Sequence, residues 1–129
     1  MKRTVLLLAV LCSWLKCSAL CGSTGLRLWP SGKTVKQNTL FVINGYSDSE
    51  YIYQLNKKYP IYLRSGDEKI ELKVWEILTG YHVIQAIIIP EKKLAAGKEY
   101  QLFIDSLPKY APPYHKGYTG FEKYIPAKW

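Results

Sequence analysis

The residues that most often carry chemistry are few in this chain and poorly spaced for it. His82 and His115 are its only histidines, and its three cysteines, Cys12, Cys17 and Cys21, all lie near the start. A zinc site draws three or four such ligands, usually from close pairs, and the two histidines stand far apart in the sequence. The sequence therefore predicts no metal site and no cofactor, and it favours a surface or sheet-face position for His82.

The patterns of nucleophilic, carboxylate and phosphate chemistry are also incomplete. The sequence has no Gly-x-Ser-x-Gly nucleophile motif. Glu71 and Glu76 are candidate carboxylates for glycoside hydrolysis, but both are expected on the solvent face of a strand. The stretch Pro30–Thr34, PSGKT, ends like a phosphate-binding loop, but Arg27 stands where the first glycine of that motif belongs. We therefore expect no catalytic residue and no enzyme activity.

Residues 1–20 have the features of an export signal. Lys2 and Arg3 give a basic start, and the apolar run Thr4–Leu15 is too short to cross a bilayer. Removal of this segment takes Cys12 and Cys17 with it, so no internal disulfide is expected in the mature chain.

Two cleavage sites compete, and they give the remaining cysteine different roles. Cys17-Ser18-Ala19 suits ordinary cleavage after Ala19. Alternatively, Cys21 resembles the acceptor cysteine of bacterial lipoproteins, which have a small residue where this chain has Leu20. Acylated Cys21 would tether the domain to a membrane, whereas unmodified Cys21 would be a free thiol near the start of the mature chain.

The charge balance is basic. Lys and Arg total 18 against 10 Asp and Glu, a formal charge of +8, and three of the basic residues lie in the export segment. This excess favours loose attraction to anionic envelope polymers or lipid headgroups, but it names no ligand. Because the chain is expected to be exported, the predicted partner is a protein or an envelope glycan and not a nucleic acid.

The 129 residues have room for a single domain with one core, which we place at residues 21–107. Tyrosine, with 11 copies, and the β-branched residues favour strands. The clearest alternation lies in Lys69–Ile77, where Ile70, Leu72 and Val74 are expected to face the core. Strands are predicted at about 25–29, 38–44, 50–56, 60–66, 69–77, 81–90 and 100–105, with no helix. About seven short strands with turn-rich connections favour an all-β, two-sheet antiparallel sandwich.

The stretch Leu94–Tyr100, LAAGKEY, resembles the corner by which immunoglobulin-like and fibronectin-like sandwiches pass from one sheet to the other. In that corner, Leu94 would plug the core, Gly97 would take a positive φ, and the Tyr100 hydroxyl would bond backbone a few residues upstream. Ala96 stands where the family usually has proline.

The opening stretch Leu28–Tyr46, LWPSGKTVKQNTLFVINGY, is similar to the start of bacterial Ig-like domains of secreted or envelope-attached proteins and of periplasmic copper-resistance sandwiches. The resemblance covers roughly residues 22–107 and implies an Ig-like fold. A copper role would need histidine and methionine ligands, and the only methionine is Met1.

The remaining residues, 108–129, differ in composition from the rest. Tyr110, Tyr114 and Tyr118 recur every fourth residue, but the prolines and glycines among them argue against a helix. We expect an irregular extension that either covers a strand edge or offers these tyrosines as contacts to a partner.

These observations together predict an exported, non-catalytic Ig-like module for binding or structural interaction at the cell envelope, lipid-anchored if Cys21 is acylated. Two alternatives stay open. One is a small periplasmic carrier or enzyme accessory subunit, and the other is an inhibitor or immunity-type protein.

Overall fold

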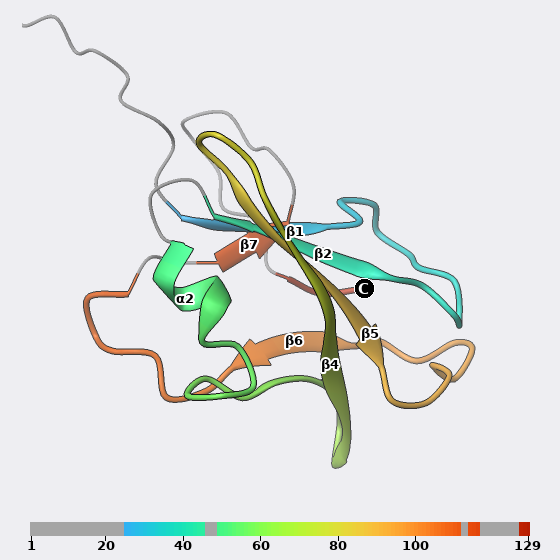
Figure 1. Ribbon diagram of the computed structural model, residues 1–129. Coiled ribbons are helices and arrows are strands. Elements are labelled where there is room, and N and C mark those ends of the chain that lie inside the picture. Colours follow the sequence, from blue (N-terminus) through green and yellow to red (C-terminus); the bar gives the residue numbers. More distant parts are fainter. Residues whose placement is uncertain (1–24, 46–48, 112–113, 117–126) are drawn as a thin grey trace, which may run out of the picture.

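The computed structural model describes residues 25–45, 49–111, 114–116 and 127–129 of this chain. In these residues the elements are β1 (Leu26–Trp29), β2 (Phe41–Gly45), α2 (Ser49–Tyr53), β3 (Ile61–Ser65), β4 (Glu68–Thr79), β5 (Ile84–Pro90), β6 (Gln101–Ile104) and β7 (Tyr114–Lys116) (Figure 1). The strands form one curled sheet in the order β6-β3-β4-β5-β2-β1-β7, antiparallel except where β1 meets β7. The predicted all-β class is confirmed, since α2 is the one helix in the part of the chain described.

Strand β4 joins the two halves of the sheet. Its first part, Glu68–Glu71, pairs with β3, whereas Leu72–Thr79 pairs with β5. The register shifts between Val74 and Glu76, which leaves Trp75 as the extra residue of a bulge. Bulges bend a strand and increase its twist, so the sheet turns here without a break in its hydrogen bonding. The described strands therefore form one continuous sheet that bends at β4, where the sequence predicted two separate sheets.

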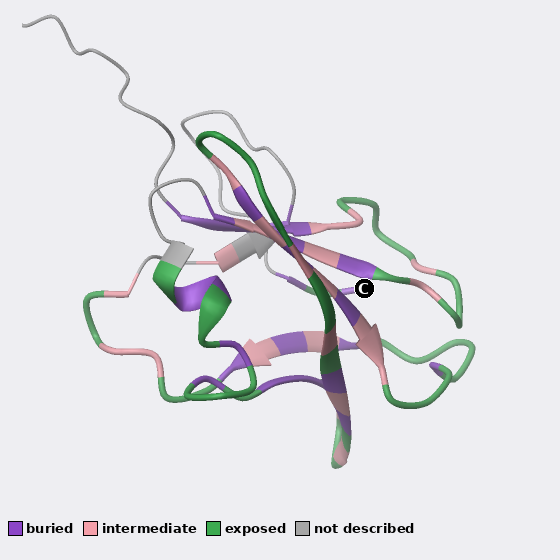
Figure 2. Ribbon diagram, viewed as in Figure 1, coloured by how far each residue is buried: buried purple, intermediate pink, exposed green. Residues whose placement is uncertain are grey.

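Alternate residues of the strands face one common core, as the banding of buried and less buried residues in Figure 2 shows. In β4, Ile70 and Leu72 are buried while Lys73 and Trp75 are exposed, as the alternation predicts. The strands supply the core residues Leu26, Leu28, Phe41, Ile43, Ile61, Leu63, Ile70, Leu72, Ile84, Ala86, Ile88, Leu102 and Ile104.

The predicted strand at 50–56 is wrong, because this segment begins with helix α2. Tyr51, Ile52 and Leu55 are buried while Tyr53 and Gln54 are exposed, which is the spacing of one helical face. The helix packs against β2 and β5 and covers one end of the core. A short run of apolar and aromatic residues has too little periodicity to distinguish a single helical turn from a strand.

The described parts of residues 108–129 belong to the folded unit, contrary to the prediction of an irregular extension. Tyr114–Lys116 form β7, which pairs with β1. The segment Ala127–Trp129 lies along β6, where the backbone N–H groups of Tyr100 and Leu102 donate to the carbonyls of Trp129 and Ala127 at 2.6 and 2.8 Å. These residues cover an edge of β6, which is the first of the two roles expected for this segment from the sequence.

Trp129 fills the space between that edge and the first strands. Its side chain is only 6% exposed, and its indole N–H donates to the carbonyl of Pro30 at 2.8 Å. Its ring meets Phe41 edge-to-face with centroids 4.9 Å apart. The tryptophan therefore connects β6 to β1 and β2 through the core.

Lys116 of β7 lies beside Trp129 and is almost completely buried. Its ammonium group donates to the carbonyls of Gly32 and Lys128 at 3.0 and 2.6 Å and lies 5.2 Å from the centre of a Trp129 ring. Burial lowers the pKa of Lys116. Bonds from a charged donor are stronger than neutral ones, so this lysine joins β7, the β1–β2 loop and the last described segment.

We predict that Trp129→Ala lowers the free energy of unfolding by about 3 kcal/mol, since it removes a large buried aromatic side chain. The matched control is Lys128→Ala, which removes an exposed neighbour in a surface ion pair with Glu99 and should change stability by less than about 1 kcal/mol. Urea denaturation followed by circular dichroism measures both. Equal midpoints for the two variants would show that Trp129 is not part of the core.

Candidate functional site

The three predicted corner residues, Leu94, Gly97 and Tyr100, connect β5 to β6 and so carry the chain from one half of the sheet to the other. Leu94 is 3% exposed, and Gly97 has φ of 73°. The buried Tyr100 hydroxyl accepts a hydrogen bond from the backbone N–H of Ala95 at 3.0 Å. These three features are those expected of the corner, and they hold the β5–β6 connection against the core.

A cluster of ion pairs at the surface joins the same corner to Glu68, the first residue of β4. The Glu68 carboxylate meets the ammonium groups of Lys92 and Lys98 at 2.8 and 2.6 Å. Hydrogen bonds from Lys92 and then Lys98 lower the pKa of Glu68 from 4.5 to about 2. The charged form of Glu68 is therefore the one that holds the corner in place.

We predict that Tyr100→Phe lowers the free energy of unfolding by about 1 kcal/mol, because the Ala95 N–H loses its acceptor in a part-buried site. Tyr53→Phe is the matched control, since the Tyr53 hydroxyl forms an exposed hydrogen bond with Thr79 Oγ1 at 3.1 Å. The control should be destabilised less. An unchanged denaturation midpoint for Tyr100→Phe would contradict the role of its hydroxyl.

The lowered pKa of Glu68 predicts a stability that depends on pH. Its stabilising contribution is fully present above pH 4.5 and is lost as the pH falls from 4.5 toward about 2. Glu68→Gln should therefore lose part of the stability difference between pH 6 and pH 3 at low salt, as measured by urea midpoints. Glu76→Gln, at an exposed carboxylate, should keep the wild-type difference. Identical pH dependence in wild type and Glu68→Gln would contradict the assignment.

The predicted contact and tether residues have three different outcomes. Tyr110 is 84% exposed, between β6 and β7. Tyr114 is half-buried and packs against the core, and burial raises the pKa of its hydroxyl. It is therefore not a free surface contact. Tyr118 and Cys21 lie outside the described residues.

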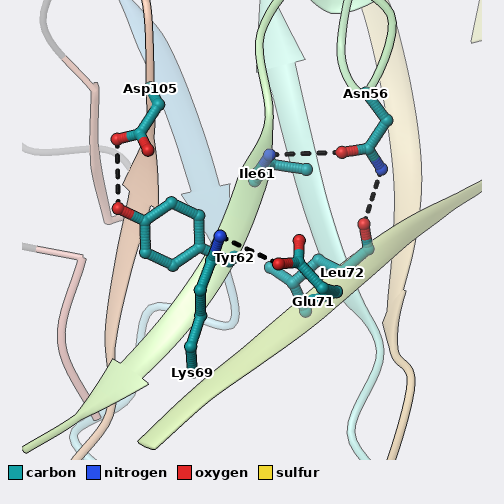
Figure 3. A network of polar contacts seen from close by, with 7 residues as sticks. All are labelled: Asn56, Ile61, Tyr62, Lys69, Glu71, Leu72 and Asp105. Atoms are coloured by element: carbon teal, nitrogen blue, oxygen red, sulfur yellow. Dashed lines mark hydrogen bonds and ion pairs between the residues drawn. The ribbon is translucent and has the colours of Figure 1, made fainter. Parts of the chain in front are cut away.

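A polar network covers the outward side of β3, β4 and β6 (Figure 3). The Tyr62 hydroxyl donates to Asp105 at 3.0 Å, and its ring stacks on Phe103 with centroids 5.7 Å apart. Burial and the bond to Asp105 raise the pKa of Tyr62. Lys69 lies 4.2 Å from the Tyr62 ring centre and 2.9 Å from Glu71. These groups are committed to one another, so the network serves packing between strands.

Asn56 extends this network to the turn before β3. Its side-chain amide donates to the carbonyl of Leu72 at 2.6 Å and accepts from the N–H of Ile61 at 3.2 Å (Figure 3). The residue has a positive φ of 59°, a conformation that asparagine tolerates better than most residues. Asn56 thereby positions α2 and β3 against β4.

The other half of the sheet has an apolar outward side that no described element covers. Trp29, Val42 and Ile87 stand opposite one another on β1, β2 and β5, and each alternates with core residues along its strand. We call this surface the outer face; it consists of Trp29, Leu40, Val42, Trp75, Ile87 and Ile89. Its most exposed members are Trp75, at 64%, and Leu40, at 49%.

Polar groups border the outer face. The next row across the same side holds Arg27, which is buried, and the part-buried Asn44 and Gln85. The buried side-chain oxygen Oδ1 of Asn44 has no hydrogen-bond partner among the described residues. On another border, Lys73 and Glu91 form an exposed ion pair at 3.1 Å. An apolar centre with a polar rim is the usual composition of a protein-binding surface.

The amino-acid sequence gives an indication of this surface, although none of the predicted contact residues belongs to it. Trp75 falls on the solvent side of the Lys69–Ile77 alternation, and a large apolar side chain in that position has no core to fill. In the strand predicted at 81–90, Ile87 and Ile89 are part-exposed on the side away from the core. The two segments become one surface only through the pairing of β4 with β5.

The outer face has the chemistry of apolar contact. None of its six members is titratable. Among residues 25–45, 49–111, 114–116 and 127–129, no group of three or more His, Cys, Asp or Glu side chains could hold a metal ion. In the same residues, no helix has the length and apolar character needed to cross a membrane.

Comparison with known proteins adds no relative. No protein-family model, no curated protein and no solved structure matches this chain. The function is therefore inferred from the residues of this chain and their geometry alone.

Proposed function

We propose that this chain is a non-catalytic binding module that holds a protein partner through its outer face. The observation that carries this proposal is the exposure of Trp75 next to the part-exposed Ile87 and Ile89, on a sheet side that no described element covers. Exposed apolar surface with a polar rim marks interaction sites. Tryptophan also recurs among the residues that dominate binding energies.

The composition of the outer face favours a protein over a glycan as the partner. Leu40, Val42, Ile87 and Ile89 are aliphatic, and aliphatic side chains bind by excluding water from apolar surface. Sugar recognition relies instead on aromatic rings surrounded by hydrogen-bonding groups. A carrier would need a concave pocket, whereas the interior here is filled by side chains such as Phe41 and Tyr100. An inhibitor or immunity-type role would use the same kind of surface and is one form of this proposal.

We further propose that the curled sheet is an Ig-like sandwich. One layer would comprise β6, β3 and the first part of β4, and the other the second part of β4 with β5, β2, β1 and β7. The support is the corner at Leu94–Tyr100 together with the shared core between the layers.

The proposed place of action is the cell envelope. The support comes from the sequence, in which Lys2, Arg3 and the apolar run Thr4–Leu15 have the form of an export signal. Cys21 follows that signal closely and is the proposed site of a lipid tether.

We predict that Trp75→Ser abolishes partner capture without unfolding the domain. The wild-type protein and the variant would each be crosslinked in the cells that make the chain, then purified and compared by mass spectrometry. Tyr110→Ser is the matched control, because it also replaces an exposed aromatic residue but lies outside the outer face. The expected result is a crosslinked partner that is present with the wild type and with the control. With Trp75→Ser its amount should fall at least tenfold, which corresponds to a loss of about 1.4 kcal/mol in binding free energy. Equal capture by all three proteins would contradict the proposal.

A further inference from the structure

The end of the sheet at which the described chain starts is defined by strand register. Leu26, Gly45, Ile84 and Thr79 stand opposite one another on β1, β2, β5 and β4. The described chain starts one residue before this row, at Gly25. The β4–β5 turn follows directly after Thr79, so it projects from the same end, at the top left of the view in Figure 1.

Three of the exposed tyrosines lie on connections at this end. Tyr81, in the β4–β5 turn, is 94% exposed, and its ring contacts His82 edge-to-face at 4.2 Å. Tyr53, on α2, is 39% exposed and hydrogen-bonds Thr79 of the defining row. Tyr110, 84% exposed, precedes β7, whose first residue stands opposite Leu26. We call Tyr53, Tyr81 and Tyr110 the tyrosine end.

The distribution of charge differs between the two ends of the molecule. From Ile77 to Pro90, which includes the whole β4–β5 turn, the chain has no Asp, Glu, Lys or Arg. At the opposite end the β1–β2 and β5–β6 loops meet, with the Leu94 N–H donating to the Gln37 carbonyl at 2.9 Å. Those two loops hold the lysines Lys33, Lys36, Lys92, Lys93 and Lys98 and the acidic residues Glu91 and Glu99.

Charged residues of both signs occur near the tyrosine end, and the acidic ones among the described residues are Glu50 on α2 and Asp105 after β6. Lys57 and Lys58 lie in the exposed turn before β3, which the Asp105 N–H joins to β6 through the Pro60 carbonyl at 2.9 Å. Lys109 is next to Tyr110. Each lysine close to an anionic lipid surface contributes roughly 1 kcal/mol of attraction.

The chain between Cys21 and the sheet is short. Leu26 stands five positions after Cys21 in sequence, and five residue steps span at most about 18 Å when fully extended. An acyl chain on Cys21 would therefore hold the Leu26 row close to the membrane surface. The β4–β5 turn at the same end would lie within reach of the headgroup region.

We propose that the tyrosine end contacts the phospholipid headgroup region of the membrane to which Cys21 is tethered. This inference rests on the proposed tether. Tyrosine is enriched at membrane interfaces because its ring is apolar and its hydroxyl stays hydrated. A turn without charged residues enters that region without the cost of desolvating a charge. The lysine-bearing loops at the opposite end then face water.

The test uses the full chain, produced in a bacterial host that acylates lipoproteins and reconstituted into vesicles of phosphatidylethanolamine and phosphatidylglycerol. Tyr81→Cys places an environment-sensitive fluorophore in the β4–β5 turn, and Lys93→Cys places it at the opposite end as a matched control. Both positions are exposed, so labelling should leave the fold intact, which circular dichroism verifies. Intact mass measures acylation at Cys21.

The expected result is several-fold stronger quenching of the residue 81 label than of the residue 93 label by lipids that carry a headgroup-level quencher. An acylated, vesicle-bound protein whose two labels are quenched equally would overturn the membrane contact and leave the tether intact. A chain without acyl mass that does not bind vesicles would overturn the tether and this inference together. Protein capture by the outer face would be unaffected by either outcome, so its failure is distinguishable.

Discussion

Tyr100 makes the contacts on which the closed form of this molecule depends. Its backbone N–H and carbonyl both pair with Trp129, and its hydroxyl accepts from the N–H of Ala95. The residue thus fixes the corner between the two halves and, at the same time, the segment that covers the edge of β6. A buried tyrosine bonded at both ends is strongly constrained. Tyr100 thereby holds the Ala127–Trp129 segment against β6.

Ala127 and Trp129 of this segment belong to the core cluster of the described residues. Trp129 and Lys116 contact each other, and they bond the carbonyls of Pro30 and Lys128 respectively. The apolar residues on the outer side of β5 then have no role in the core. These apolar residues, together with Trp75 of β4, are the physical basis of the proposal that this side of the sheet binds a partner.

Sequence reasoning succeeded where a residue type can satisfy only one local geometry. The alternation around Ile70 and Leu72 specifies a half-buried strand, and the structure has β4 there. Reasoning from composition failed at the segment containing Tyr51 and Ile52, because one helical turn and a short strand have similar patterns. It also failed at Tyr114, whose proline-rich surroundings suggested an irregular extension rather than a strand of the sheet.

The sequence by itself determined that the chain is all-β, since a periodicity of two is a local property. It also located the connection between β5 and β6, because the spacing of Leu94, Gly97 and Tyr100 is local as well. Only the tertiary structure decided which side chains share a surface. Trp29, Val42 and Ile87 are distant in sequence and meet because β1, β2 and β5 pair in one register. Such pairing depends on contacts between remote segments, so a pattern within one segment cannot specify it. The same reason explains why the burial of Trp129 became visible only in the fold.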